Sequence, residues 1–210
     1  MSYLVIELQK SALDDSVTTI NLLRKALVVA KKLKISEFEK WINNELNGYE
    51  DNNNIPKYRQ VYGQLRALNP YRGWIPTSFG ENSEMEDMAS KKNVGDSISK
   101  IEYLLKTEGN TLCMLFPSEV ESMLAKMFQF ETKYQLFIDK SQFNRILESV
   151  RTIILNWALE LECDGILGEE MIFNSEEKEI ANEKNYTINN FFGDVSNSNI
   201  QQHSNQSSQY

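Results

Sequence analysis

The sequence predicts a mainly α (α+β) protein: a helical bundle with a small β-hairpin insertion near residues 55–79 and a polar C-terminal tail that has the pattern of short strands. Three observations support this fold class. Apolar residues recur at helical spacing over most of the chain, prolines and glycines gather around an alternating segment, and the last residues are rich in Asn, Ser and Gln. The expected parts are an N-terminal helical part (1–50), a hairpin and connector (51–95), a C-terminal helical part of the same domain (96–184) and the tail (185–210).

Three helices are expected in the N-terminal part. An apolar stripe over residues 4–12 predicts the first, and residues 18–33 carry two adjacent apolar faces, which is typical of a helix packed on both sides. The third helix is predicted to begin with an S-x-x-E capping box, formed by Ser36 and Glu39. It is predicted to end at Gly48, which is placed to adopt a left-handed conformation.

A β-hairpin is predicted after these helices. Three of the four prolines lie between residues 55 and 79, and apolar and polar residues alternate from Val61 to Ala67, as in a half-buried strand. The Asn69–Gly73 segment has turn composition, so Trp74-Ile75 is expected to pair back as a short strand. The polar residues 80–95 are expected to form a mobile connector.

The C-terminal helical part is expected to mix helices with short strands. Ser118 and Glu121 predict a second capping box after Pro117, at the start of a helix that buries Met123 and Met127. The expected elements are a helix from about 97 to 105, a short strand or buried loop at 111–116, a helix at 118–128, a short strand at 134–138, a long helix from about 141 to 163 and an exposed helix at 175–184.

Composition excludes several chemistries. The chain of 210 residues and 24.3 kDa has a net charge of −8, two cysteines and one histidine, His203. A Cys/His zinc site needs about four such ligands, and a Ser-His-Asp triad would depend on this single tail histidine. We therefore assign no catalytic residue, no metal ligand and no cofactor, and a non-enzymatic role is favoured.

The sequence also predicts a location. The first residues lack the features of a signal peptide, and the most apolar stretches are too short or too polar to cross a membrane. Two cysteines without a secretory signal are expected to stay reduced. A cytoplasmic protein without membrane association is expected.

The N-terminal part is the only basic portion, because the net charge is +3 over residues 1–80, −4 over 81–150 and −7 over 151–210. It contains a basic and aromatic cluster. Three interpretations are open: a hairpin whose aromatic side chains pack on the helices, a protein-binding hot spot, and a surface for single-stranded nucleic acid, in decreasing order of preference. The cluster consists of Lys57, Tyr58, Arg59, Tyr62, Arg66, Tyr71, Arg72 and Trp74.

Carboxylates gather after the long helix, and a metal-dependent hydrolase could use them. Because no His or Lys accompanies them, a solvated acidic surface is favoured. The residues are Glu160, Glu162, Asp164, Glu169 and Glu170.

The tail favours two outcomes equally. Fifteen of the 26 residues from 185 onward are Asn, Ser or Gln, which is typical of disorder. Four apolar residues flank a Gly193-Asp194 turn, however, and two strands there would pair with copies of the chain. These self-association residues are Ile188, Phe192, Val195 and Ile200.

The N-terminal sequence resembles a known family. The resemblance is carried by the run from Leu22 to Leu33, by FEKWINNELNGY at residues 38–49 and by IPKYR at residues 55–59. These segments are similar to the AbiTii-type domain of bacterial phage abortive infection proteins, over about residues 1–165. The resemblance implies a role in phage exclusion, and it carries no catalytic motif to this chain.

The motif residues are expected to have structural roles first. Glu45 lies among apolar positions, and a buried carboxylate needs a partner, so a bidentate ion pair between Glu45 and Arg59 is predicted. The residues of the structural motif are Trp41, Glu45, Leu46, Gly48, Tyr49 and Arg59.

The favoured function is therefore phage defence by recognition of an unidentified phage or host protein. A second defence-system protein is a further candidate partner, and the tail predicts a homo-oligomer. The alternative is a nucleic-acid-binding toxin or nuclease that uses the basic aromatic hairpin.

Overall fold

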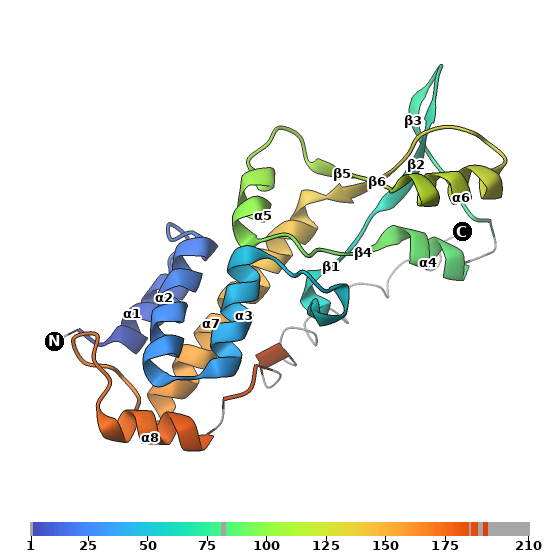
Figure 1. The fold of residues 1–210 in the computed structure, drawn as a ribbon. Helices are drawn as coiled ribbons and strands as arrows, with labels where there is room; N and C mark the ends of the chain where they lie inside the picture. The colour runs from blue at the N-terminus through green and yellow to red at the C-terminus, as the bar shows by residue number, and fades with distance from the viewer. Residues whose placement is uncertain (1, 81–82, 185, 189–190, 193–210) are drawn as a thin grey trace, which may run out of the picture. The chain divides into compact units, whose positions relative to one another are not determined.

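The computed structural model describes residues 2–80, 83–184, 186–188 and 191–192, and it confirms a mainly α-helical fold with small antiparallel sheets (Figure 1). The chain forms two compact units. Unit 1 comprises Met1–Tyr58, Gly95–Lys100 and Ile146–Tyr210, and unit 2 comprises Arg59–Val94 and Ile101–Arg145. Each unit is thus assembled from segments that are not consecutive in the sequence.

Unit 1 is helical. α2 packs against both α1 and α3, as expected for this helix. One of its apolar faces is fully buried, and the other is buried at Leu23 and Ala30 and half-buried at Ile20 and Leu27. The helices are α1 (Leu4–Leu13), α2 (Thr19–Leu33), α3 (Ser36–Asn47), α7 (Lys140–Cys163, of which residues 146–163 belong to unit 1) and α8 (Ser175–Lys184). Two short 3-10 turns follow α3, η1 (Asn52–Asn54) and η2 (Lys57–Arg59).

The core of unit 1 joins helices that are distant in the sequence. Trp157 of α7 stacks on Phe38 of α3 with the ring centroids 4.3 Å apart. Phe191 packs edge-on against the same Phe38 ring at 5.3 Å. Phe191 and Tyr186 are both buried, so the beginning of the predicted tail contributes to this core.

The predicted start of α3 is wrong by one residue. Ile35 occupies the N-cap, and no side-chain cap is formed. Lys34 ends α2 with φ of 60°, so only two residues connect α2 to α3, and Ile35 is buried. Burial of Ile35 outweighs the capping preference of Ser36. At the other end, Gly48 terminates α3 with φ of 98°, as the sequence predicts.

Unit 2 is built around a four-stranded antiparallel sheet with the strand order β3-β2-β6-β5. β2 and β3 form the predicted hairpin, with Asn69 opposite Gly73, and β2 pairs with β6 on its other side. The strands are β2 (Gln64–Asn69), β3 (Gly73–Pro76), β5 (Thr111–Leu115) and β6 (Tyr134–Asp139). A separate two-stranded sheet pairs β1 (Gln60–Tyr62) with β4 (Lys91–Asn93).

Two details of this region were not predicted. Gly63 divides the expected strand into β1 and β2, and a β-carbon at this position would lie 2.5 Å from Cγ of Leu136 in β6. Only glycine fits that close approach. The expected connector is also structured, because residues 80–95 contain α4 (Ser83–Ser90) as well as β4.

α4 and α6 (Ser118–Phe128) cover one face of the four-stranded sheet (Figure 1). Leu65 and Tyr134 from the sheet pack with Leu124 and Phe128 of α6. Pro117 is the N-cap of α6, so the second predicted capping box is also not formed. The burial predicted for two methionines of α6 is wrong, since α6 turns other residues toward the sheet and leaves Met123 and Met127 exposed. α5 (Ile98–Leu105) spans the boundary between a unit 1 segment and a unit 2 segment.

Candidate functional site

The second face of the four-stranded sheet carries aromatic, basic and apolar side chains. Side chains alternate between the two faces of a sheet, and Leu65 and Ala67 point toward α4 and α6. Arg66 therefore points to the opposite face. The register adds Gln135 opposite Arg66 and Phe137 opposite Gln64 to this face.

The aromatic side chains on this face contact one another. The rings of Trp74 in β3 and Phe137 in β6 lie 5.5 Å apart. The guanidinium carbon of Arg66 lies 4.6 Å from the centroid of Phe137, within the range of a cation–π interaction. Leu115 of β5, in register with Gln135, is 75% exposed. Arg66, Trp74 and Phe137 are half-buried. We call Arg66, Trp74, Leu115 and Phe137 the open sheet face.

The other residues of the predicted basic and aromatic cluster have different surroundings. Arg59 is fully buried, and its Nη1 donates to the Val94 carbonyl oxygen at 2.9 Å. Tyr71 and Arg72 lie at the tip of the β2–β3 hairpin, where the backbone N–H groups of both donate to Asn69. Tyr71 is 95% exposed. Tyr62 and Arg72 are exposed in unit 2, while Lys57 and Tyr58 belong to unit 1.

The sequence motif in unit 1 contains a buried polar network. The Glu45 side chain is fully buried, and its carboxylate accepts hydrogen bonds from the hydroxyl groups of Tyr49 at 2.6 Å and Tyr58 at 2.5 Å. The Tyr58 hydroxyl in turn accepts a hydrogen bond from the Trp41 indole N–H at 2.9 Å. Trp41 and Glu45 lie one helical turn apart on α3. Tyr49 and Tyr58, which follow Gly48 in the chain, place their hydroxyl groups next to them. These contacts do not test the predicted Glu45–Arg59 pair, which stays a prediction.

A small pocket of about 380 Å³ adjoins this network. Trp41 and Tyr49 line it, together with Ile188 and Phe192 from the predicted self-association segment. The Phe192 ring lies 5.6 Å from the Tyr58 ring. Val195 and Ile200, the other two self-association residues, lie outside the described residues.

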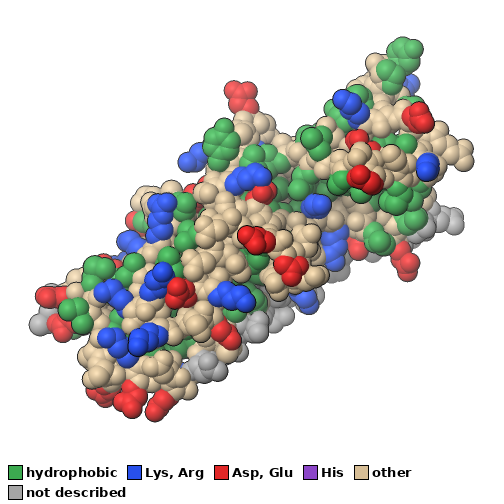
Figure 2. Space-filling view, in the orientation of Figure 1, with side chains coloured by type: hydrophobic (Ala, Val, Ile, Leu, Met, Phe, Trp, Pro, Cys, Tyr) green, Lys and Arg blue, Asp and Glu red, His purple; other side chains and the backbone are tan. Residues whose placement is uncertain are grey.

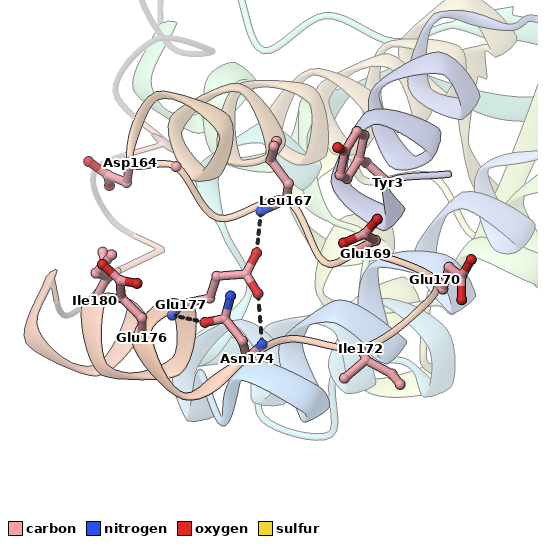
Figure 3. Close-up of a pocket in the computed structure, with 11 residues that line it drawn as sticks. Tyr3, Asp164, Leu167, Glu169, Glu170, Ile172, Asn174, Glu176, Glu177 and Ile180 are labelled. Carbon is pink, nitrogen blue, oxygen red and sulfur yellow. Dashed lines mark hydrogen bonds between the residues drawn. The ribbon is translucent and has the colours of Figure 1, made fainter. Parts of the chain in front are cut away.

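Three residues of the acidic cluster, Asp164, Glu169 and Glu170, line a pocket of about 720 Å³ at the end of α7 (Figure 3). Glu177 also lines this pocket. Its carboxylate accepts hydrogen bonds from the backbone N–H groups of Leu167, Gly168 and Asn174 at 2.8–2.9 Å. In return, the Oδ1 atom of Asn174 accepts a hydrogen bond from the backbone N–H of Glu177. These two residues therefore form the capping box of α8. This N-x-x-E signal at residues 174–177 was not predicted.

Two of the carboxylates that a hydrolase could have used, Asp164 and Glu160, interact with neighbouring side chains. Asp164 accepts a hydrogen bond from Tyr186 at 2.5 Å and pairs with Lys184 at 2.7 Å. Those contacts lower the pKa of Asp164, whereas burial and the nearby Asp164 charge raise the pKa of Glu160. Among the described residues, no group of His, Cys, Asp or Glu side chains is arranged to hold a metal ion. The contacts of Asp164 with Tyr186 and Lys184 support a structural role for this carboxylate.

The capping box predicts a pH effect on stability. Burial alone raises the pKa of Glu177, but three backbone N–H donors and Lys178 outweigh it and hold this pKa below its ordinary value. A carboxylate with a lowered folded-state pKa stabilises the fold above its unfolded-state pKa, and that stability is lost as the pH falls through the folded-state pKa. We expect Glu177→Gln to be less stable than the wild type at pH 7.

The difference in the free energy of unfolding between the wild type and Glu177→Gln should shrink below about pH 4, where the carboxyl group of Glu177 is protonated in the unfolded state. Urea denaturation at pH 7 and pH 3 measures it, with Glu176→Gln as the exposed neighbouring control. An equal difference at both pH values would contradict a stabilising role for the ionised carboxylate.

The fold and its surfaces define a mainly α-helical protein with an open antiparallel sheet face and a buried polar network in its N-terminal motif. The AbiTii family model matches residues 3–186, so the chain belongs to the AbiTii family. This family membership implies abortive infection, a form of defence against phage. No curated protein and no solved structure matches the chain. None of the described helices is long and apolar enough to cross a membrane.

Proposed function

We propose that this protein acts in abortive infection by binding a phage or host protein through the open sheet face. The observation that carries the proposal is the contact group of Trp74, Phe137 and Arg66 beside the exposed Leu115. Trp and Arg are enriched among the residues that supply most of the binding energy at protein interfaces. Strands also hold such side chains in a fixed arrangement, which lowers the entropy lost on binding.

The composition of this face favours a protein over a nucleic acid. Binding to a phosphate backbone depends on several cations, because each neutralised phosphate releases counterions. The open sheet face contributes one guanidinium, Arg66, next to an apolar leucine, and the chain as a whole has a net charge of −8. An apolar and aromatic centre with few charges matches the core of a protein interface.

The double variant Arg66→Ala/Trp74→Ala tests the proposal. We expect it to restore plaque formation by about tenfold or more, because hot-spot truncations cost about 2 kcal/mol or more each. The variant should also stop co-purifying with the phage or host protein that the wild type retains. Circular dichroism and thermal melting of both proteins verify that the variant is folded.

Tyr103→Ala, which removes a 71% exposed aromatic side chain of α5, is the matched control and should protect like the wild type. Full protection by the double variant would reject the open sheet face as the binding surface. Binding of the wild type to single-stranded RNA or DNA that weakens steeply with salt would favour the nucleic-acid alternative. In that case Arg66→Ala/Arg72→Ala should reduce the salt dependence.

Self-assembly through the tail is part of the proposed function. Tyr186 and Phe191 are buried in unit 1, so a truncation that tests the tail must leave them in place. We expect removal of residues 193–210 to lower the mass measured by light scattering, without a change in the melting temperature. Val195→Ser/Ile200→Ser in the full chain should have the same effect if apolar strands drive assembly. An unchanged mass in both proteins would end this part of the proposal.

A further inference from the structure

A methionine-rich groove runs between α4 and α6 in unit 2, on the sheet face opposite to the open sheet face. Hydrophobic side chains reach the surface over this part of the molecule (Figure 2). Leu124 of α6 and Leu136 of β6 line the groove, and Phe79 and Phe116 contribute aromatic rings. Four methionines line it as well: Met85 and Met88 from α4, and Met123 and Met127 from α6.

The groove leaves apolar surface in contact with solvent. Met88 is 79% exposed and Met123 is 55% exposed. α6 therefore has two apolar faces: Leu124 and Phe128 pack on the sheet, while Met123 and Met127, one turn apart, face the groove. Methionine side chains are flexible and polarisable, so they adapt to the shape of an apolar partner.

The charged side chains that line the groove are both basic. Lys91 and Lys92 of β4 line it, and no carboxylate among the described residues does so. The acidic side chains of α4 and α6 lie outside the lining: Glu84, Glu86, Asp87, Glu119 and Glu121. In a chain with a net charge of −8, an apolar groove with two cations at its rim is complementary to an apolar segment that carries acidic residues.

We propose that this groove binds an acidic amphipathic helix of a partner protein. Apolar side chains of that helix at positions i, i+4 and i+7 would contact the four methionines, and its carboxylates would pair with Lys91 and Lys92. The groove has a volume of about 320 Å³, at the lower end of the range of about 300–1,000 Å³ for ligand pockets. That volume suits a few anchoring side chains rather than a large cofactor.

The positions of the methionines allow a direct test. The chain has seven methionines, four of which line the groove. The full-length protein is labelled with ¹³C at the methionine methyl groups and titrated with a helical peptide of about 16 residues that has Leu at i, i+4 and i+7 and Glu on both flanks. We expect shifts of the four groove methyls, with the exposed Met171 of unit 1 as the internal reference.

Variants of the protein and of the peptide separate the contribution of the apolar contacts from that of the charges. Met88→Gln/Met123→Gln should weaken binding of the acidic peptide by about tenfold, whereas Met171→Gln should not change it. Lys91→Glu/Lys92→Glu should reverse the preference, so that the same peptide with Lys in place of Glu binds more tightly. All three substituted regions are exposed, so folding is expected to persist.

Three results would overturn the inference: equal shifts of Met171 and the groove methyls, equal affinity for a peptide with Ser in place of Leu, or unchanged affinity in Met88→Gln/Met123→Gln. This test is independent of the open sheet face. Loss of phage protection in Arg66→Ala/Trp74→Ala and loss of peptide binding in the groove variants are separate outcomes.

Discussion

Replacing Arg151 with methionine is expected to lower the free energy of unfolding by about 3 kcal/mol, because several buried and partly buried backbone carbonyl groups would lose their hydrogen bonds. Arg151 of α7 is buried, and its guanidinium donates to the backbone carbonyl oxygens of Ala12, Asp14 and Val17 at 2.7–2.9 Å. A longer contact of 3.3 Å reaches Ser11. The last carbonyls of a helix lack partners within the helix, so this single side chain provides hydrogen-bond donors for two of them in α1 and for two carbonyls in the loop that follows.

Urea denaturation followed by circular dichroism measures the effect. Arg151→Lys should recover only part of the lost stability, because a compact ammonium group does not reproduce the planar fork of the guanidinium. Arg24→Met removes an exposed arginine of α2, whose guanidinium donates to the neighbouring Asn21, and serves as the matched control. A loss no greater for Arg151→Met than for Arg24→Met would show that these carbonyls find other partners.

Replacing Glu45 with alanine is expected to have a similar effect, about 3 kcal/mol, in the motif that carries the family resemblance. The substitution leaves the phenol groups of Tyr49 and Tyr58 without their shared acceptor in a buried site and also creates a cavity. Tyr49→Phe should cost about 1 kcal/mol, because it removes the hydrogen bond to Glu45 together with its donor. Tyr58→Phe should cost more, because it also removes the oxygen that accepts the Trp41 indole N–H. Phage protection at the growth temperature should fall with the stability of these variants.

Thermal melting and urea denaturation measure this series. Glu39→Ala is the control on the same helix, because Glu39 makes a partly exposed ion pair with Lys31 at 3.5 Å, and such pairs contribute little. In Glu45→Ala, adding Tyr58→Phe should cost less than it does alone, because the acceptor is already gone. Additive losses would show that the phenol–carboxylate contact does not stabilise the protein.

Local sequence patterns predicted the hairpin and the described helices other than α4, but not the starts of α3 and α6. The two apolar faces of α2 and the turn at Asn69–Gly73 depend on short-range chemistry that a sequence displays directly. Two S-x-x-E boxes were predicted and neither forms, because Ile35 and Pro117 take the N-cap positions. The capping box that does form joins Asn174 to Glu177. At α3 the N-cap position follows from the burial of Ile35, which is a property of the tertiary structure, whereas Pro117 at the start of α6 is exposed.

The candidate site was only partly predictable for the same reason. Arg66 and Trp74 belong to the predicted cluster, but their neighbours Phe137 and Leu115 come from β6 and β5, far along the chain. Strand order and register join these residues, and neither follows from local composition. The burial of Arg59, within the same short sequence segment, is likewise decided by long-range packing.

The interleaved order of segments in the two units constrains how this protein can be divided or recombined. The chain passes between the units after residues 58, 94, 100 and 145, so no single cut releases both units intact. A genetic exchange with one crossover inside residues 59–145 would join segments from two different parents within one unit, so that paired strands or packed core residues would come from different proteins. The family match extends over both units, from residue 3 to residue 186. We therefore expect the two units to be inherited together, and functional chimaeras to require paired junctions at the boundaries of unit 2.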